Sequence, residues 1–347
     1  MTSQAQVLSV WRVLACGAAI VTLSMGVRHG FGLWLQPITE AQGWTRQDFA
    51  LAIAVQNLTW GVVGIFSGMV ADRFGASKVI VVGAVLYALG ILGMAWADSV
   101  PVFLVTAGLL IGVAQAGTTY AVVYGVIGRN IPADKRSWAM GVTAAAASFG
   151  QFLMVPVEGQ LILAFGWQEA LVWVACIMLV AIPFAWLLRE PHFSRTGAIQ
   201  RDQTILEAVR EAFTYRSFQL LMAGYFVCGF QVVFIGVHMP SFLKDEGYGA
   251  EVASIALALI GLFNVVGTYT AGVLGQHFPK RKILAFIYSS RSLVILVFLA
   301  LPMTPASIYL FSAVMGLLWL STVPVTSASV AQIFGVVHLS MLSGFVF

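Results

Sequence analysis

Three ionisable side chains interrupt stretches that are otherwise apolar, small or aromatic. Arg28 and His29 lie within SMGVRHGFGLWL, residues 24–35, and Glu158 lies within VPVEGQLIL, residues 155–163. A guanidinium group presents a planar fork of N–H donors that suits a carboxylate. A carboxyl group can pair with such a cation or carry a proton. These residue types predict either the recognition of an anion or an internal ion pair.

The elements that must position these residues are membrane spans. Of the 347 residues, 60% are hydrophobic and only 9% are charged, which excludes a soluble domain. Apolar runs of about 20 residues, long enough to cross a bilayer, recur along the chain, so we expect an all-α, multi-pass protein of the cell membrane. The predicted spans are 10–36, 49–71, 76–97, 101–128, 138–165, 168–189, 217–243, 250–275, 282–301 and 305–333, followed by the start of an eleventh.

The sequence shows no chemistry typical of an enzyme. Cys16, Cys176 and Cys228 fall inside predicted spans without paired spacing or a neighbouring histidine cluster, so we expect neither a disulfide nor a metal site. No Ser–His–Asp spacing and no phosphate-binding glycine loop are apparent. We therefore predict no catalytic residue and no cofactor.

The lysine and arginine positions predict the orientation in the membrane. With the N-terminus inside, the cytoplasmic segments hold 14 of the 18 basic residues, and the outer loops hold only Arg46 and Lys244. Basic residues are retained on the cytoplasmic side during insertion, so a cytoplasmic N-terminus is expected. The net charge of +4 reflects this topology, and we expect the lipid bilayer but no nucleic acid as a partner.

A polar segment, 190–216, separates an N-terminal six-helix bundle at 1–189 from an incomplete C-terminal bundle at 217–347. Apolar residues at helical spacing predict an amphipathic helix on the inner membrane surface, which serves either as a flexible tether or as a regulatory site. The apolar residues are Ile205, Leu206, Val209 and Phe213, opposite Glu207, Arg210 and Glu211.

The two sides of this segment resemble each other in sequence. A shift of 204 positions aligns identical residues across four spans in one register, and repeated bundles of six spans are typical of transporters. About 60 further residues would complete the second bundle. The aligned pairs are Gly43 with Gly247, Gly68 with Gly272, Phe74 with Phe278, Lys78 with Lys282, Pro101 with Pro305, and Gly112 with Gly316.

The segment GMVADRFGASKV, between the second and third spans, resembles the signature of the major facilitator superfamily. The resemblance implies two pseudo-symmetric six-helix bundles and a gating role for Gly68, Asp72, Arg73 and Gly75. Asp72 is suited to interact with a helix N-terminus and with basic neighbours, and Gly75 permits a tight turn. The equivalent segment of the second half, GVLGQHFPKRKI, lacks the Asp–Arg pair, so any lock there is weaker or different.

Three further motifs resemble the bacterial monocarboxylate and oxalate–formate carriers of that superfamily: GVRHGFGLWLQPI, QNLTWG and FGQFLMVPVEGQLILAFGW. This resemblance implies a secondary active transporter that moves a small, monocarboxylate-like anion by alternating access, with proton coupling or by exchange. The fifth span lacks the Gly-Pro-x-x-Gly-Gly pattern of drug–proton antiporters. A drug or metabolite exporter of the same superfamily and a non-transporting membrane sensor remain the alternatives.

Two interpretations of Arg28 compete. A charge within the bilayer costs about 3 kcal/mol on insertion scales, so the guanidinium group requires a cavity or a partner. In the first interpretation it binds the carboxylate of the substrate. In the second it pairs with Glu158 at a similar depth, and disruption of the pair by substrate or a proton would couple transport to the proton gradient. His29 points about 100° away from Arg28 around the helix. We expect it to serve as a packing or hydrogen-bonding residue, and a proton relay is the alternative.

Other polar residues within spans are candidates for substrate binding. The superfamily resemblance implies a cavity lined by spans 1, 4, 7 and 10, which favours Tyr120, Tyr124 and His238. Asn57 is a further candidate, although such residues often serve only as hydrogen bonds between helices. Arg291 must turn inward from a peripheral span, either toward substrate or toward a cluster of backbone carbonyl groups.

Overall fold

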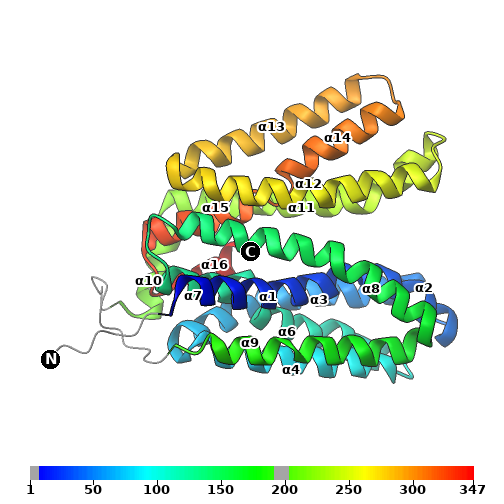
Figure 1. The fold of residues 1–347 in the computed structure, drawn as a ribbon, viewed down its shortest axis with the longest axis horizontal. Helices are drawn as coiled ribbons and strands as arrows, with labels where there is room; N and C mark the ends of the chain where they lie inside the picture. The colour runs from blue at the N-terminus through cyan, green and yellow to red at the C-terminus, as the bar shows by residue number, and fades with distance from the viewer. Residues whose placement is uncertain (1–7, 191–202) are drawn as a thin grey trace.

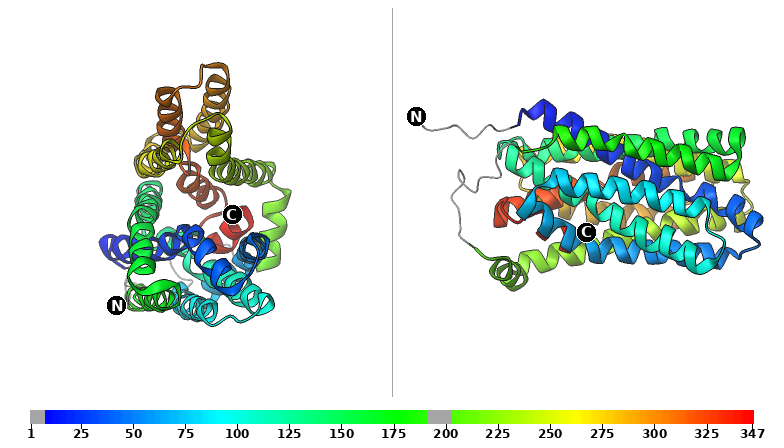
Figure 2. Two further views of the ribbon diagram at one scale, coloured as in Figure 1. Left: turned by 90° about the vertical axis from the view of Figure 1, so that its right-hand side faces the viewer. Right: turned by 90° about the horizontal axis from the view of Figure 1, so that it is seen from below.

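The computed structural model describes residues 8–190 and 203–347; residues 1–7 and part of the predicted linker, 191–202, lie outside the described residues. Every element in the described part of the chain is helical. The helices run along one long axis (Figures 1 and 2). By their order in the chain we call α1–α9 the first bundle and α11–α16 the second bundle, although α16 lies against α3 and α7 of the first.

The first bundle consists of long apolar helices joined by short turns. Its elements are α1 (Val10–His29), α2 (Phe31–Gln42), α3 (Arg46–Phe74), α4 (Ala76–Ala95), α5 (Val100–Phe103), the π-helix η1 (Leu104–Leu110), α6 (Ile111–Thr118), α7 (Tyr120–Asn130), α8 (Arg136–Leu179) and α9 (Ala181–Leu187). After α10 (Ile205–Thr214), the second bundle contains α11 (Arg216–Asp245), α12 (Ala250–His277), α13 (Lys280–Ala300), α14 (Pro305–Leu318), α15 (Thr322–Phe334) and α16 (Leu339–Val346).

The structure describes nine helical stretches that are long and apolar enough to cross a membrane. One of them, Arg136–Leu187, contains the predicted span 138–165 and all but the last two residues of the predicted span 168–189. The chain reverses within it at Gly166, whose φ of +77° is left-handed backbone that a side chain would strain. The predicted turn between these two spans is therefore at its expected place.

Three spans that we expected to be continuous are broken. The first divides at Gly30 into α1 and α2, the fourth divides at Thr119 into α6 and α7, and the tenth divides at Trp319–Ser321 into α14 and α15. Hydropathy does not reveal such breaks, because a broken apolar helix has the composition of a continuous one. Backbone groups freed inside a membrane need other partners, and side chains supply them at two of these breaks.

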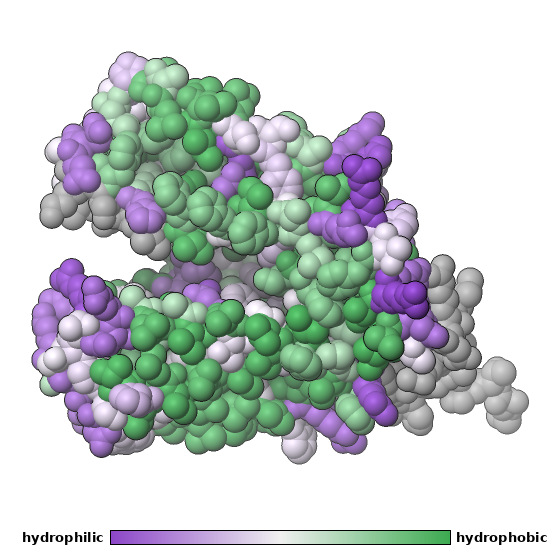
Figure 3. Space-filling model, turned by 180° about the vertical axis from the view of Figure 1, so that it is seen from behind, coloured by the Kyte–Doolittle hydropathy of each residue, from purple (hydrophilic) through white to green (hydrophobic). Residues whose placement is uncertain are grey.

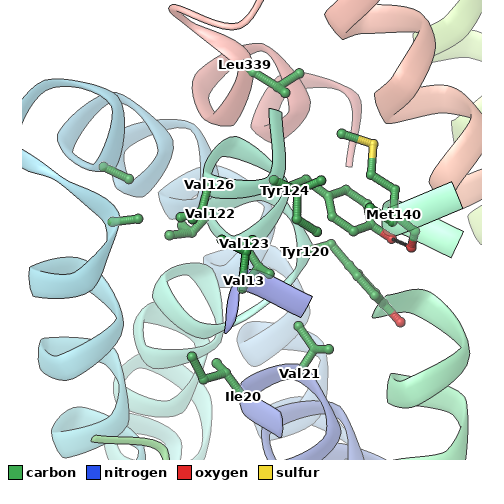
Figure 4. Packing of buried hydrophobic residues seen from close by; sticks show 14 of the residues in the cluster. Val13, Ile20, Val21, Tyr120, Val122, Val123, Tyr124, Val126, Met140 and Leu339 are labelled. Atoms are coloured by element: carbon green, nitrogen blue, oxygen red, sulfur yellow. Dashed lines mark hydrogen bonds between the residues drawn. The ribbon is translucent and has the colours of Figure 1, made fainter. Parts of the chain in front are cut away.

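A large apolar core joins α1, α4, α7 and α8 of the first bundle to α16 of the second. Figure 4 shows part of this cluster, which includes Val13 and Ile20 of α1, Val123 of α7 and Leu339 of α16. The core thus packs these five helices against one another.

The bundles meet closely at one end of the molecule. Here α8 and α12 cross so that a Cβ added to Gly141 would lie 2.6 Å from the Cα of Gly272. On α3, a Cβ added to Gly68 would lie 2.5 Å from the carbonyl oxygen of Ser340 in α16. We call this the closed end. At the opposite end, where α2 lies, the surface is hollowed between the bundles, with hydrophilic residues on the inner wall (Figure 3).

The predicted amphipathic helix corresponds to α10, at the closed end. It begins with a capping box, in which the Glu207 carboxylate accepts a hydrogen bond from the Thr204 N–H over 2.8 Å. The Thr204 backbone N–H, followed by its hydroxyl group, lowers the pKa of Glu207 below its usual range. Ala208 and Ala212 are buried against the bundles, whereas Leu206 is 77% exposed, so the helix packs mainly through its alanine face.

Candidate functional site

The guanidinium group of Arg28 lies at the C-terminal end of α1, two residues before the break at Gly30. Its Nη2 donates to Asn57 Oδ1 over 2.7 Å, and its Nη1 donates to Gln115 Oε1 over 3.1 Å. The Trp60 ring covers one face, with its centroid 4.4 Å from Cζ. The Arg28 side chain is half-buried and that of Asn57 is exposed. Three helices, α1, α3 and α6, therefore position this cation.

Neutral polar groups lie behind the cation. Gln115 Nε2 donates to Gln56 Oε1 over 3.3 Å and to the Tyr87 hydroxyl over 3.2 Å. Tyr87 donates to the Ser24 carbonyl over 3.3 Å, and Gln56 donates to the Ala107 carbonyl over 2.8 Å. These contacts use the amide nitrogen of Gln115 inside the bundle, so its oxygen is left to face the guanidinium group.

The charge of Arg28 is not neutralised within the described part of the chain, because no described carboxylate lies within ion-pair distance of it. Both of its acceptors are uncharged amides, and they use two of the five N–H donors of a guanidinium group. The remaining donors form a fork that can bind a carboxylate in bidentate fashion.

The alternative in which Arg28 pairs with Glu158 is wrong for this conformation. Glu158 is fully buried on α8, where its Oε2 accepts from Trp34 Nε1 over 2.8 Å and its Oε1 has no partner among the described residues. The carboxyl group packs against Gly30 and occupies the space that the Cβ atom of any other residue at position 30 would need. Residues 28 and 30 point in different directions from one helix, so Arg28 faces α3 and α6 while Gly30 faces α8.

Among the aromatic candidates, Tyr120 lies within electrostatic range of Arg28 but no hydrogen bond joins them in the described part of the chain. Tyr124 is fully buried, and its hydroxyl donates to the Met140 carbonyl over 3.1 Å within the core (Figure 4). The Tyr120 ring packs 5.5 Å from that of Tyr124. His238 is exposed on α11 with its ring 4.9 Å from Phe234. Of the predicted substrate-binding residues in the described part of the chain, Asn57 is the one that hydrogen-bonds to Arg28, and Tyr124 is corrected to a core residue.

Arg291 binds backbone carbonyl groups, which decides between the two roles expected for it. Its side chain is 1% exposed, and its Nε donates to the Leu318 carbonyl over 3.0 Å. Nη2 donates to the carbonyls of Leu318 and Trp319, and Nη1 donates to Gln231 Oε1 over 3.4 Å. The break between α14 and α15 frees these carbonyls, and Arg291 satisfies them. We therefore withdraw its assignment to substrate.

Asp72 joins the bundles at the closed end. Its Oδ2 accepts from the Met341 N–H over 2.9 Å and its Oδ1 from the Ser340 N–H over 3.3 Å, which caps the first turn of α16. Arg129 Nη1 donates to Oδ1 over 2.8 Å, and Arg129 also pairs with Glu190 over 3.2 Å. A carboxylate is favourable at a helix N-terminus, so one side chain ties α3 to both α7 and α16.

The other residues of the predicted gating motif have distinct positions. Gly68 allows α16 to approach α3, and Gly75 has a φ of +97° in the turn between α3 and α4. Arg73 is exposed, with its guanidinium carbon 5.3 Å from the Phe74 ring centroid. The cation that pairs with Asp72 is thus Arg129 rather than the adjacent arginine.

Four residues of the site were not among those predicted to bind substrate: Gln56, Trp60, Tyr87 and Gln115. The motif QNLTWG contained a signal for the first two, because residues 56, 57 and 60 lie within one helical turn. Tyr87 and Gln115 are single polar residues in apolar spans, and no spacing relates them to Arg28.

Comparisons with known proteins give a consistent picture. The family model described as "Major Facilitator Superfamily" matches residues 14–347. The uncharacterized MFS-type transporter YcxA of Bacillus subtilis is 24% identical over 326 residues, which are 88% of this chain and 76% of that protein. Monocarboxylate transporter 11 of Mus musculus is 27% identical over 271 residues, and the match spans 77% of this chain but only 59% of the mouse protein.

The fucose:proton symporter FucP of E. coli is similar in structure. It aligns with a TM-score of 0.74 at 16% identity, over 96% of this chain and 87% of that chain. At this identity the match shows the fold alone.

Proposed function

Because the chain belongs to the Major Facilitator Superfamily, we propose that it carries a small, monocarboxylate-like organic anion across the membrane by alternating access. The observation that supports this substrate class most directly is the Arg28 guanidinium group, a full positive charge held by neutral amides inside a membrane-spanning element. The name of the mouse relative, a monocarboxylate transporter, is consistent with this class.

The placement of Arg28 favours a site reached from the end opposite the closed end, where α2 lies. A charged group that is only half-buried within a span must face water rather than lipid. The surface of the protein is hollowed between the bundles at the end where α2 lies (Figure 3). Trp60 occupies one face of the guanidinium plane, so an anion approaches the edge that carries the N–H groups. A planar carboxylate fits that edge with two parallel hydrogen bonds.

Glu158 is the proposed site of proton coupling. An isolated carboxylate is costly in an apolar interior, and this carboxyl group has a single described hydrogen-bond donor, Trp34. A proton removes that cost, and its release requires a change around Gly30, against which the carboxyl group packs. Gain and loss of the proton would thereby accompany movement at the break between α1 and α2.

We further propose that the closed end faces the cytoplasm and that Gly68, Asp72, Arg73 and Gly75 serve as its gate. The charge asymmetry of the loops supports this orientation. The capping of α16 by Asp72 supplies a contact that must break when this end opens.

Uptake by the full chain in proteoliposomes tests the substrate role of Arg28. With labelled formate, oxalate and lactate as probes, we expect saturable uptake of at least one anion. Arg28→Ala should abolish it, and Arg28→Lys should raise KM by about tenfold because the fork is lost. Arg46→Ala removes an exposed arginine outside the site and serves as the control. Unchanged uptake in Arg28→Ala would overturn the proposal.

A separate measurement tests coupling. In Glu158→Gln, we expect exchange of substrate across the membrane to continue, whereas uptake no longer responds to an imposed pH gradient. An undiminished response to the gradient would show that another group carries the proton.

A further inference from the structure

Residues 60 and 264 are equivalent under the shift of 204, and the side chain of each forms a hydrogen bond at the break of a central helix. Trp60 Nε1 donates to Thr119 Oγ1 over 3.1 Å, at the break between α6 and α7. Asn264 Oδ1 accepts from the Leu320 N–H over 3.0 Å, at the break between α14 and α15. In each bundle, a side chain on a flanking helix thus fixes the break of a central one.

The two residues differ in their second contact. Trp60 lies over Arg28, whereas Asn264 Nδ2 donates to Ser148 Oγ over 2.9 Å, on α8 of the first bundle. The Leu320 N–H can only donate, so it determines which end of the Asn264 amide is the oxygen and leaves the nitrogen for Ser148. Asn264 is 1% exposed and Ser148 is 4% exposed.

The hydrogen bond between Ser148 and Asn264 lies near the closest approach of the bundles. Along α8, Ser148 follows Gly141 by about two helical turns, and along α12 Asn264 precedes Gly272 by about the same distance. Figure 1 shows α8 and α12 side by side where the bundles meet. A movement that separates these helices at the closed end breaks this bond.

Loss of the hydrogen bond to Ser148 frees the nitrogen of the Asn264 amide, whose oxygen bonds to the break between α14 and α15. Arg291 holds the freed carbonyls entirely from within the second bundle, so it does not respond directly to the first bundle. Asn264 responds directly because it contacts both the first bundle and the break.

We propose that Asn264 is a positioning residue of the transport cycle, which fixes the break between α14 and α15 in its present form only while α8 and α12 are closed. Closure of α8 against α12 thereby determines the backbone conformation at the break between α14 and α15. The inference rests on the alternating access of the proposed function, but not on the identity of the substrate.

Single-cysteine labelling of the full chain tests this link. In a background with Cys16, Cys176 and Cys228 changed to serine, Ser137→Cys reports opening of the closed end. Ser137 is 3% exposed between α8 and α12, and its hydroxyl has no partner among the described residues. In a second background, Ser321→Cys reports exposure of the break, where the native side chain is 2% exposed. N-ethylmaleimide is the probe.

We expect Ser148→Ala to raise the labelling rate at both reporters by about fivefold, which is the effect of one neutral hydrogen bond. The response at residue 321 is decisive, because Ser148 lies in the other bundle. In Asn264→Ala, the added Ser148→Ala change should have no further effect, since the link is already lost. The control is Ser312→Ala, which removes a buried hydroxyl bonded only to its own helix and should change neither rate.

Two results would overturn the inference. One is an unchanged rate at residue 321 in Ser148→Ala, which would leave Asn264 as a support of its own bundle. The other is a full effect of Ser148→Ala in the Asn264→Ala background. Anion uptake by the wild-type chain tests the proposed function separately, so a failure of one is distinguishable from a failure of the other.

Discussion

Replacing Asp72 by asparagine should open the closed end. The Asp72 side chain accepts two backbone N–H groups of α16 and pairs with Arg129. Asparagine keeps the shape and one acceptor oxygen, but its NH2 group must face an N–H donor. The change therefore removes the ion pair and one charge-assisted hydrogen bond, while Glu190 still partners Arg129.

The size of the effect follows from these losses. Hydrogen bonds to charged groups contribute about 1.5 to 3 kcal/mol each, and the remaining partner of Arg129 limits the cost of the lost pair. A net loss of about 2 to 3 kcal/mol corresponds to a roughly 30- to 150-fold shift toward the open form, at 1.36 kcal/mol per tenfold change.

The maleimide labelling rate of the Ser137→Cys reporter measures this shift, because labelling of a buried cysteine follows the open population. Asp72→Asn should raise the rate by the factor above until the open form predominates. Asp48→Asn is the matched control, since Asp48 caps the start of its own helix, α3, through Thr45. A rate in Asp72→Asn equal to that of the control would refute the gating role of this carboxylate.

Three further changes test the packing. Gly272→Ala places a Cβ 2.5 Å from the Cα of Gly141 and should reduce uptake at least tenfold, whereas Gly229→Ala, with open space around it, should stay within twofold. Arg291→Ala strands two buried carbonyls and should lower the unfolding free energy by about 2 to 4 kcal/mol, measured by denaturation in detergent. Gly166→Ala should lower it by about 1 to 3 kcal/mol, because φ is +77° and ψ is 167° there, a backbone conformation that is essentially restricted to glycine.

The sequence was sufficient to predict the membrane helices, because span length and apolar composition are properties of each segment alone. It also located the turn at Gly166, where two spans meet without a polar loop. The breaks at Gly30, Thr119 and Trp319–Ser321 could not be predicted in this way. Their stability depends on contacts from other helices, such as that of Arg291, and these contacts appear only when the chain is folded.

The candidate site was predicted in part for the same reason. A charge within an apolar stretch is visible in the sequence, so Arg28 and Glu158 could be identified. Depth along a helix predicted that they could pair, but depth does not determine which neighbour each residue faces. The structure directs Arg28 to Asn57 and Gln115, and Glu158 to Trp34. A pairing prediction requires the rotation of each helix, which no spacing in one span supplies.

The repeat extends to side-chain contacts, and one of its divergences bears on the proposed function. Ser24 and Thr118 are joined over 2.8 Å, and their equivalents Cys228 and Thr322 are joined over 3.2 Å. The next equivalent pair differs, because position 87 is tyrosine and position 291 is arginine. In the second bundle Arg291 donates hydrogen bonds to the backbone carbonyls at the break between α14 and α15. In the first bundle the tyrosine bonds to the glutamine behind Arg28, and Arg28 is the cation that we propose for anion binding.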